Sequence, residues 1–330
     1  MILIKRVLLL GVLLTIGAGA WLAHYLFTPV ALPANPYEFN VKSGTTLKRV
    51  AQQLAQAGVI EQPFAFTLAA RLSGKGSALK AGNYSLDSAL TPWDLLGKLT
   101  KGDVSQSAVK FIEGWNFRQL RQALDSQPDI QHDTRGMSDA EIMAKLGSPN
   151  QHPEGRFFPD TYFFTSGMSD LAILARAYKL MQTQLENTWR ERAANLPYQS
   201  MEEALIMASI VEKETGQAAE RPLIAGVFIN RLRIGMLLQT DPTVIYGLGE
   251  RYDGNLHKRD LLSDTPYNTY TRAGLPPTPI AMPGADALHA AVNPTPTKAM
   301  YFVARGNGMH YFSATLSEHN QAVNKYQRRQ

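Results

Sequence analysis

The sequence contains no cysteine. A chain without thiols has no disulfide framework, no thiolate zinc site, no iron–sulfur cluster and no cysteine nucleophile. Its seven histidines are scattered and show no H-E-x-x-H or comparable spacing, which excludes the common zinc hydrolases. There is also no G-x-S-x-G nucleophile elbow. The absence of cysteine fits an exported protein that avoids stray disulfides. We also predict that the protein uses no metal and no cofactor.

The sequence also lacks a large excess of positive or negative charge. Lys and Arg total 33 against 28 Asp and Glu, which gives a formal net charge of +5. The basic stretches Arg231-Leu-Arg233 and Arg328-Arg329 are short and lack interleaved aromatic residues. Nucleic-acid binding requires a denser basic surface, so we predict no nucleic-acid partner. A mild positive balance suits an anionic polymer such as cell-wall glycan.

One long apolar run lies near the N-terminus. Residues 7–27 contain no charge and would form a helix about 31 Å long, close to the thickness of the hydrocarbon core. Trp21 and Tyr25 stand near its far end, where interfacial aromatic residues are common. Lys5-Arg6 precede the run, so we expect residues 1–6 in the cytoplasm and the body of the protein across the membrane.

A cleaved signal peptide is the alternative for this segment. Ala18-Gly-Ala20 resembles a cleavage site with small residues. Because the apolar run continues past Ala20, we favour an uncleaved single-pass anchor. Prolines in residues 28–36 predict a stiff spacer after it.

The rest of the chain predicts an α+β protein with two units after the single N-terminal transmembrane helix. Residues 37–103 show a strand–helix–helix–strand order with a further helix, and no plausible catalytic set. The pattern V-x-x-G-T-T-L at 41–47 resembles LysM-type glycan-binding units. Residues 104–330 predict a larger mixed α+β catalytic domain, with a hairpin of strands 300–304 and 309–313 near its end.

A helix predicted over 201–215 places a carboxylate in a position that disfavours its charge. On a wheel of 100° per residue, Ser209 lies on the polar side, Glu214 lies about 60° from the centre of the apolar arc and Glu212 about 100°. A carboxylate on the buried side of a helix C-terminus suffers desolvation and the negative end of the helix dipole, and both raise its pKa. A general acid working near neutral pH needs this property. A solvated helix end remains the structural alternative.

Polar and aromatic residues follow in two nearby blocks. Asp241-Pro242 fit the start of a helix with Asp241 as N-cap, so a purely structural role for Asp241 stays open. Sugars are typically held by amides and hydroxyls together with aromatic faces. The candidate substrate-binding residues of this kind are Gln239, Thr240, Asp241, Tyr246, Tyr267, Asn268 and Tyr270.

The ordered set of these blocks resembles the endolytic murein transglycosylases, the YceG-like family. The resemblance is dense between residues 150 and 320 and thin before 110. The runs that carry it are Glu154-Gly, Phe158-Pro-Asp-Thr-Tyr162, Ala208-Ser-Ile-Val-Glu-Lys-Glu-Thr215, Val227-Phe-Ile-Asn-Arg-Leu232, Leu238-Gln-Thr-Asp-Pro-Thr-Val-Ile-Tyr-Gly247, Tyr267-Asn-Thr-Tyr270 and Gly274-Leu-Pro-Pro277.

The resemblance implies a bitopic inner-membrane protein with its catalytic domain in the periplasm. It implies cleavage of the β-1,4 bond between N-acetylmuramic acid and N-acetylglucosamine in nascent peptidoglycan strands, with 1,6-anhydromuramic acid ends that terminate elongation. The second Glu of E-K-E-T, Glu214, is then the catalytic residue. Peptidoglycan synthases are the implied protein partners.

Two other interpretations stay open. A hydrolase acting on the same glycan would use Glu214 with Asp241 or Asp160 as a second carboxylate. A wall-binding or scaffold protein would not need Glu214 at all.

Overall fold

The computed structural model describes residues 2–42, 44–104 and 107–327, and the Arg328-Arg329 pair lies outside them. The described chain forms two compact units. The first holds the residues up to Ala108 together with Asp129–Gln131 and Phe163–Met168. The second holds Val109–Pro128, His132–Tyr162 and the chain from Ser169 onward. The predicted limits at 37–103 and 104–330 remain a prediction.

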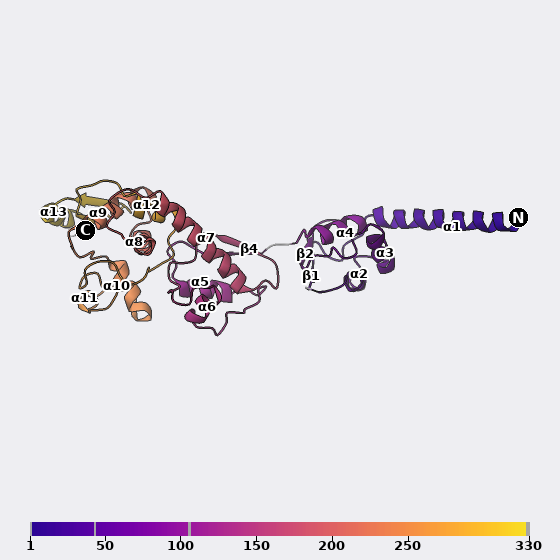
Figure 1. Ribbon diagram of the computed structural model, residues 1–330, viewed down its shortest axis with the longest axis horizontal. Coiled ribbons are helices and arrows are strands. Elements are labelled where there is room, and N and C mark those ends of the chain that lie inside the picture. Colours follow the sequence, from indigo (N-terminus) through magenta and orange to yellow (C-terminus); the bar gives the residue numbers. More distant parts are fainter. Residues whose placement is uncertain (1, 43, 105–106, 328–330) are drawn as a thin grey trace. The chain divides into compact units, whose positions relative to one another are not determined.

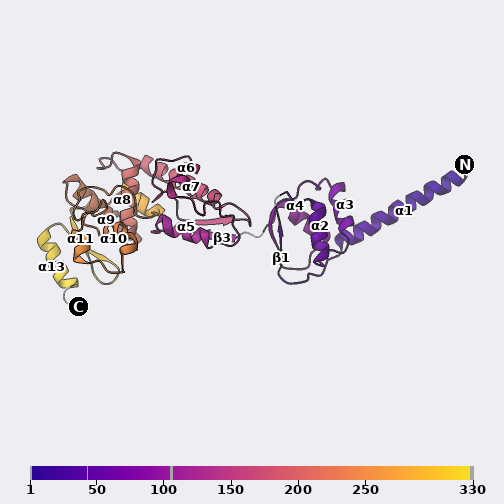
Figure 2. The ribbon, with the colours of Figure 1, turned by 90° about the horizontal axis from the view of Figure 1, so that it is seen from below.

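The first unit contains the predicted strand–helix–helix–strand–helix order (Figures 1 and 2). Strands β1 and β2 pair antiparallel, with Tyr37 opposite Leu86 and Val41 opposite Gly82. The helices bury apolar side chains against this pair, as the helical spacing predicts. The likeness to a LysM unit stays a prediction. The elements are α1 (Ile2–Phe27), β1 (Tyr37–Val41), α2 (Leu47–Gln56), α3 (Pro63–Leu72), β2 (Gly82–Leu86) and α4 (Pro92–Lys101).

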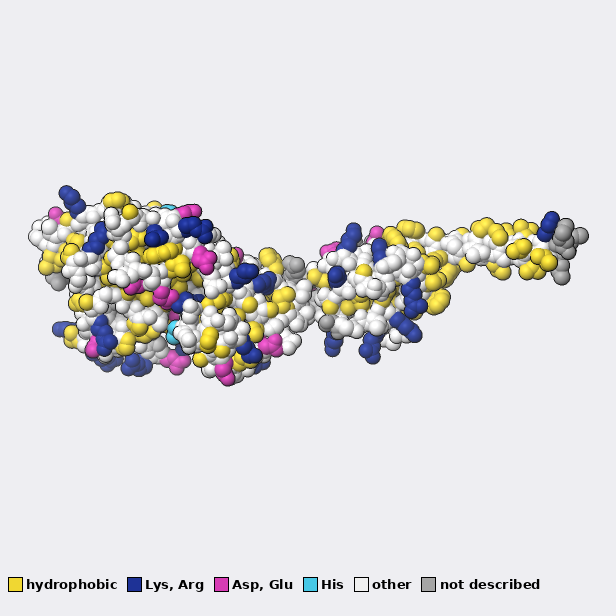
Figure 3. Space-filling view, viewed as in Figure 1, with side chains coloured by type: hydrophobic (Ala, Val, Ile, Leu, Met, Phe, Trp, Pro, Cys, Tyr) yellow, Lys and Arg dark blue, Asp and Glu magenta, His cyan; other side chains and the backbone are white. Residues whose placement is uncertain are grey.

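Helix α1 is long and apolar enough to cross a membrane over Ile4–Phe27. Its hydrophobic side chains are exposed along the helix (Figure 3). Its C-terminal end packs on the first unit: the Tyr25 hydroxyl donates to the Gln62 carbonyl at 3.1 Å. The Phe27 ring lies 6.1 Å from the Trp93 ring. Such a helix fits a membrane anchor or a signal segment.

The second unit is mostly helical, and its strands pair in two-stranded sheets. The hairpin predicted around residues 305–308 is confirmed, because β5 and β6 pair antiparallel with Ala304 opposite His310. Strands β3 (Ser107–Lys110) and β4 (Thr161–Phe164) are each divided equally between the two units. The other elements of the second unit are α5 (Phe117–Asp125), α6 (Asp139–Lys145), α7 (Asp170–Arg190), α8 (Met201–Glu214), η1 (Ala218–Glu220), α9 (Arg221–Arg233), α10 (Asp241–Leu248), η2 (Gly249–Arg251), α11 (Lys258–Leu262), α12 (Ala285–Val292), β5 (Tyr301–Ala304), β6 (His310–Ser313) and α13 (Leu316–Tyr326).

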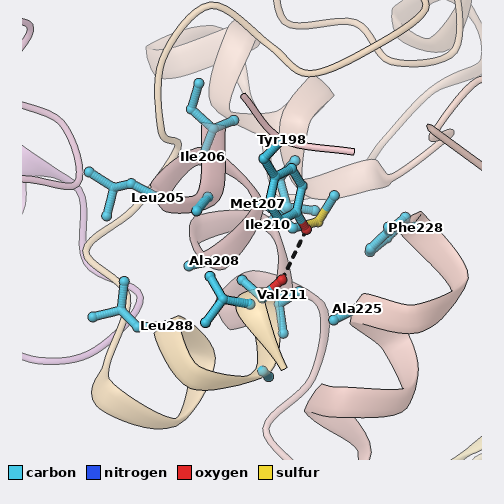
Figure 4. Packing of buried hydrophobic residues seen from close by; sticks show 14 of the residues in the cluster. Tyr198, Leu205, Ile206, Met207, Ala208, Ile210, Val211, Ala225, Phe228 and Leu288 are labelled. Carbon is cyan, nitrogen blue, oxygen red and sulfur yellow. Dashed lines mark hydrogen bonds between the residues drawn. The ribbon is translucent and has the colours of Figure 1, made fainter. Parts of the chain in front are cut away.

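Helix α8 lies inside the core of the second unit (Figure 4). Helices α7, α9, α10 and α12 contact it, and every residue from Ala204 to Val211 is buried. The Tyr198 hydroxyl donates to the Ala291 carbonyl of α12 at 3.1 Å, the dashed line in the figure. The α8 backbone is therefore held on several sides, which fixes the place where its C-terminus projects.

The prediction that Ser209 marks a polar side of α8 is wrong. Ser209 is fully buried, and its hydroxyl donates to the Ile206 carbonyl and accepts from the Ile280 amide at 3.0 Å. The segment at Ile280 covers this face, and both hydrogen-bonding roles of the hydroxyl are satisfied there. A helical wheel shows relative polarity along one helix and cannot show that a loop covers the polar side.

Candidate active site

Glu214 is the last residue of α8, and it faces an open pocket. Thr215 follows with extended backbone angles, φ −144° and ψ 136°, so the helix stops there. The pocket has a volume of about 450 Å³. Its wall consists of Glu214, Arg231, Gln239, Asp241, Tyr270, Tyr301, Phe302, Val303, Ala304, His310, Leu316, His319, Val323 and Gln327.

Burial raises the pKa of the Glu214 carboxyl, and burial is the largest of the influences on it. One side of the residue opens to the pocket, while packed protein surrounds the rest. The nearby Asp241 charge raises the pKa further. A hydrogen bond from the Thr240 hydroxyl, 2.7 Å from Oε2, and the charges of His310 and Arg231 act in the opposite direction. The net effect is a raised pKa, which is the direction that the sequence predicts.

A buried threonine network fixes the Thr240 hydroxyl. The Thr240 amide donates to the Thr269 hydroxyl at 3.1 Å, and the Thr243 hydroxyl donates to the Thr240 carbonyl at 2.8 Å. All three threonines are buried. Gln239, just before them, adopts φ 49°, a left-handed conformation that costs energy in a residue with a side chain. The loop before α10 is thus held in one shape, with Thr240 aimed at Glu214.

The predicted N-cap role of Asp241 is wrong. Thr240 is the N-cap of α10 and Asp241 is the first helical residue. The Thr240 side chain makes no capping bond, because its hydroxyl is donated to Glu214 instead. The Asp241 carboxylate lines the pocket and accepts a hydrogen bond from the Tyr270 hydroxyl. Both residues that could have capped the helix therefore face the site.

Arg231 is a positive group in the pocket wall that the sequence suggested only as part of a short basic stretch. Although it lines the pocket, it is largely buried. Its guanidinium donates to the carbonyls of Met300, at 2.7 Å, and Leu238, at 2.6 Å. Arg231 thereby joins the start of β5 to the chain just before Gln239, and leaves a positive charge near Glu214.

His310 also lines the pocket, and a buried carboxylate orients it. Its Nδ1 lies 2.8 Å from Oε2 of Glu220, and its backbone amide donates to Oε1 of the same residue at 2.9 Å. A carboxylate at Nδ1 fixes the ring and its protonation pattern, which leaves Nε2 for other partners. Ninety positions separate the two residues, so no local pattern indicates the pair.

Glu212, two residues before Glu214, has a different environment. Its carboxylate pairs with the Arg221 guanidinium at 3.0 Å and accepts from the Gly284 amide at 3.0 Å. The side chain is only 5% exposed. Its charge is therefore matched within the protein, and Glu212 connects α8 to α9 and to the start of α12. Glu214, rather than Glu212, is the carboxyl that faces the pocket.

Three of the predicted substrate-binding residues lie elsewhere. The Tyr246 hydroxyl donates to the buried Glu154 at 3.0 Å, and its ring lies edge-on to Tyr267. The Tyr267 hydroxyl is 2.9 Å from the Thr278 hydroxyl. Asn268 is fully buried, and its side-chain amide donates to carbonyls at the C-terminal end of α11 and just after it. These residues shape the loops around the pocket, whereas Gln239, Asp241 and Tyr270 line it directly; sugar contact remains a prediction for all of them.

Within residues 2–42, 44–104 and 107–327, no group of three or more His, Asp or Glu side chains is arranged to hold a metal ion. The side chains that line the pocket supply one carboxyl with a raised pKa, a second carboxylate at Asp241, and the positive or hydrogen-bonding groups of Arg231 and His310.

The described chain thus combines a polar pocket, in which one carboxyl has a raised pKa, with an α+β fold and an apolar N-terminal helix. The chain belongs to the YceG-like family, because the sequence model of that family matches residues 39–325. It is 33% identical to an endolytic murein transglycosylase of Bacillus subtilis over 95% of this chain and 91% of the relative. A Streptococcus pneumoniae protein of the same name is 26% identical over 93% of this chain, which spans 62% of that longer relative.

A solved structure supports the same assignment. The crystal structure of a yceG-like protein from Listeria monocytogenes superposes with a TM-score of 0.58 at 30% sequence identity. The match covers 87% of this chain and 99% of the Listeria chain.

Proposed function

We propose that this protein is a membrane-anchored endolytic lytic transglycosylase of peptidoglycan. It cleaves the β-1,4 bond between N-acetylmuramic acid and N-acetylglucosamine in nascent glycan strands and leaves 1,6-anhydromuramic acid ends, which stops elongation. The observation that carries the proposal is the Glu214 carboxyl, whose pKa is raised by burial and whose Oε2 is held by Thr240 in an open pocket.

In the first step Glu214 acts as a general acid. Its proton passes to the glycosidic oxygen as the bond from C1 of the muramyl residue to that oxygen breaks. Positive charge develops on the C1 side of the sugar ring. The ionised Glu214 and the neighbouring Asp241 carboxylate both favour that charge electrostatically.

In the second step the same carboxylate acts as a general base. The C6 hydroxyl oxygen of the muramyl residue attacks C1 and its proton goes to Glu214, which restores the acid. One carboxyl group therefore completes the cycle, because the nucleophile belongs to the substrate and no water molecule has to be activated. The Thr240 hydrogen bond stabilises the ionised form between the two steps.

The proposed location is the inner membrane, with α1 as a single-pass anchor and the catalytic unit in the periplasm. Helix α1 has the length and apolarity for this role, and Lys5-Arg6 near its N-terminus favour a cytoplasmic tail. Peptidoglycan synthases, which make the strands that this enzyme would cut, are the proposed protein partners.

The test compares full-length protein with its Glu214→Gln variant on purified glycan strands, with products analysed by mass spectrometry. Wild type should give anhydro-ended fragments, and the variant should be slower by about 100-fold or more, because a neutral amide cannot transfer the proton. Glu186→Gln, at an exposed position on α7, is the matched control and should keep full activity. Equal cleavage by the Glu214→Gln variant would refute the assignment of Glu214, whereas the absence of cleavage by wild type would favour a scaffold role.

A glycan hydrolase remains the second candidate, because Asp241 brings another carboxylate to the pocket. Asp160 is exposed, and its carboxylate accepts a hydrogen bond from the Thr161 amide. It lies outside the pocket lining, so it is the weaker choice as a partner. Hydrolysis would add one water to the product mass and give reducing ends, which the same experiment detects.

A further inference from the structure

Helix α3 carries apolar side chains on both its core-facing and its exposed sides. Its sequence, PFAFTLAARL, contains a single charged residue. Phe66 and Ala70 are fully buried in the first unit, as expected for a helix packed on a core. Phe64 and Leu72, however, are 75% and 73% exposed. Single exposed apolar residues are ordinary, but a helix that is apolar on every side is normally covered.

The start of α3 lies beside the end of the apolar α1 helix. The Gln62 carbonyl accepts from the Tyr25 hydroxyl at 3.1 Å, only two residues before Phe64. Trp21 and Gln62 also line a common cavity of about 310 Å³. In Figures 1 and 2, α3 lies at the end of the first unit from which α1 emerges, and β1 lies at the opposite end.

The chain just after the C-terminal end of α3 is also connected to α1, through the ring of Trp93. The Lys75 ammonium lies 4.4 Å from the centre of the Trp93 ring, and that ring contacts Phe27. Phe27 and Trp21 are themselves 62% and 52% exposed. The residue before α3 therefore bonds directly to the last turn of α1, and the chain just after α3 is linked to the same turn through Trp93.

These contacts place α3 at the height of a membrane surface. An apolar span of about 30 Å, at 1.5 Å per residue, brings the hydrocarbon boundary to the last turns of α1. Tyr25 and Trp21 are residue types that prefer this boundary. Phe64 follows the segment bonded to Tyr25, so its exposed ring lies close to the same level. Exposed Arg71 and partly exposed Lys75 supply positive charge there, with Glu61 opposing them.

We propose that α3 is an interfacial helix that rests in the bilayer surface from which α1 emerges, with the side chains of Phe64 and Leu72 inserted among the lipids. The inference rests on α1 spanning the membrane, as in the proposed function. The first unit would then be held against the bilayer by two contacts, the span itself and the exposed side of α3.

Because the chain has no cysteine, a single introduced cysteine gives a unique labelling position. The full-length protein would carry Phe64→Cys or Leu72→Cys, labelled with an environment-sensitive fluorophore and placed in phospholipid nanodiscs. Lys42→Cys, exposed just after β1, is the water-facing control, and Leu14→Cys in the middle of α1 is the lipid-facing control. The readouts are the emission wavelength and quenching by nitroxide-labelled lipids.

We expect labels at positions 64 and 72 to emit at shorter wavelength than the label at 42, and to be quenched at least about twofold more by quenchers near the headgroups. If they match the label at 42 while the label at 14 is quenched, α1 spans the bilayer and the interfacial role of α3 is overturned. If nitroxide-labelled lipids also fail to quench the label at 14, α1 does not span the bilayer, and the inference about α3 is overturned with it. Cleavage of glycan strands tests the catalytic proposal separately and should be unchanged in the Phe64→Cys and Leu72→Cys variants.

Discussion

Glu212 and Glu214 lie within one turn of α8 but have different electrostatic surroundings. Burial raises the pKa of both side chains. Glu212 has an arginine at 3.0 Å and a backbone amide as partners, so its negative charge is matched inside the protein. Glu214 accepts a hydrogen bond from the neutral Thr240 hydroxyl, and the nearby charge of Asp241 raises its pKa while those of His310 and Arg231 lower it. A carboxylate paired with a close arginine, as in Glu212, makes a structural contact. A carboxyl that faces a pocket without such a close partner, as in Glu214, is suited to exchange a proton.

Replacing Thr240 by valine tests the role of the Thr240–Glu214 hydrogen bond in the proposed cycle. The variant loses the hydrogen bond that stabilises ionised Glu214, so the pKa of Glu214 rises further and the carboxylate becomes harder to form. Because a hydrogen bond to a charged group is worth about 1.5–3 kcal/mol, we expect kcat/KM to fall by about tenfold. The decline of activity on the alkaline side should move to higher pH, because the catalytic acid keeps its proton longer.

Rate measurements against pH on glycan strands check this expectation. Thr240→Ser is the control, since it keeps the hydroxyl and should retain the wild-type pH profile. An alkaline limb that stays in place in Thr240→Val would mean that Glu214 is not the titrating acid.

The position of the Glu214 carboxyl could be predicted from the sequence, but most of its partners could not. Helical geometry alone indicates that Glu214 lies towards the buried side at a helix end. Arg231 and His310 reach the pocket through tertiary contacts, with Met300 and Glu220 respectively, that no local pattern encodes. Asn268 is a polar residue of the kind that binds sugars, yet its side-chain amide donates to backbone carbonyls at the end of α11.

At the scale of elements, α9 packs closely on the chain after α12. A side chain at Gly226 would place its Cβ 2.6 Å from the Thr295 carbonyl, which is backbone and cannot easily move. Gly226→Ala should therefore destabilise the protein by about 1–3 kcal/mol. Gly97, inside α4, has open space where a Cβ would lie, with no atom within 4 Å, so Gly97→Ala should stabilise by about 0.5–1 kcal/mol.

Denaturation midpoints of the two glycine variants against wild type check the opposite signs. A Gly226→Ala variant as stable as wild type would show that α9 can move away from the segment at Thr295.

The limits predicted for α8 from the sequence, 201–215, agree with the structure, in which the helix ends at Glu214. Apolar periodicity does not predict helix α12, because ADALHAAV is a short, alanine-rich run whose place depends on packing against α8 and α9. Burial on several sides of α8 arises from such partners, so it could not be inferred from the sequence of α8 alone.

Glu154 links α5 to α10 and should make stability depend on pH. Its carboxylate accepts from the Phe117 amide at 3.1 Å and from the Tyr246 hydroxyl at 3.0 Å. Burial raises the pKa of Glu154 to about 7 from the ordinary value of 4.5. Its contribution to stability is therefore full below pH 4.5 and is lost as pH rises to about 7, a loss of roughly 3 kcal/mol for one such group.

Urea denaturation of wild type and Glu154→Gln at about pH 4.5 and about pH 8 measures this effect. Wild type should lose more stability than the variant between the two pH values, because the amide cannot ionise. The same pH dependence in both proteins would show that Glu154 does not take up a proton on folding in this range.

For the whole molecule, the decisive property is whether α1 remains part of the mature protein or is cleaved off. Removal of the chain up to Ala20 would leave residues 21–27, too few to span about 30 Å of hydrocarbon. Tyr25 and Phe27 in this remainder pack on the first unit, so α1 is continuous with a folded element. We therefore expect protein purified from bacterial membranes to retain its residues before Trp21, as shown by N-terminal sequencing or intact mass.

An Ala18→Leu variant provides the matched comparison, since signal peptidase needs small residues before the cleaved bond. If α1 is an uncleaved anchor, wild type and variant should have the same N-terminus, and both should stay in the membrane fraction after alkaline extraction. If wild-type protein instead begins at Trp21 and only the variant resists extraction, α1 is a signal peptide and the enzyme is released. The site at Glu214 lies in the second unit and would still be expected to cleave glycan strands, so the anchor determines where the protein acts rather than what it does.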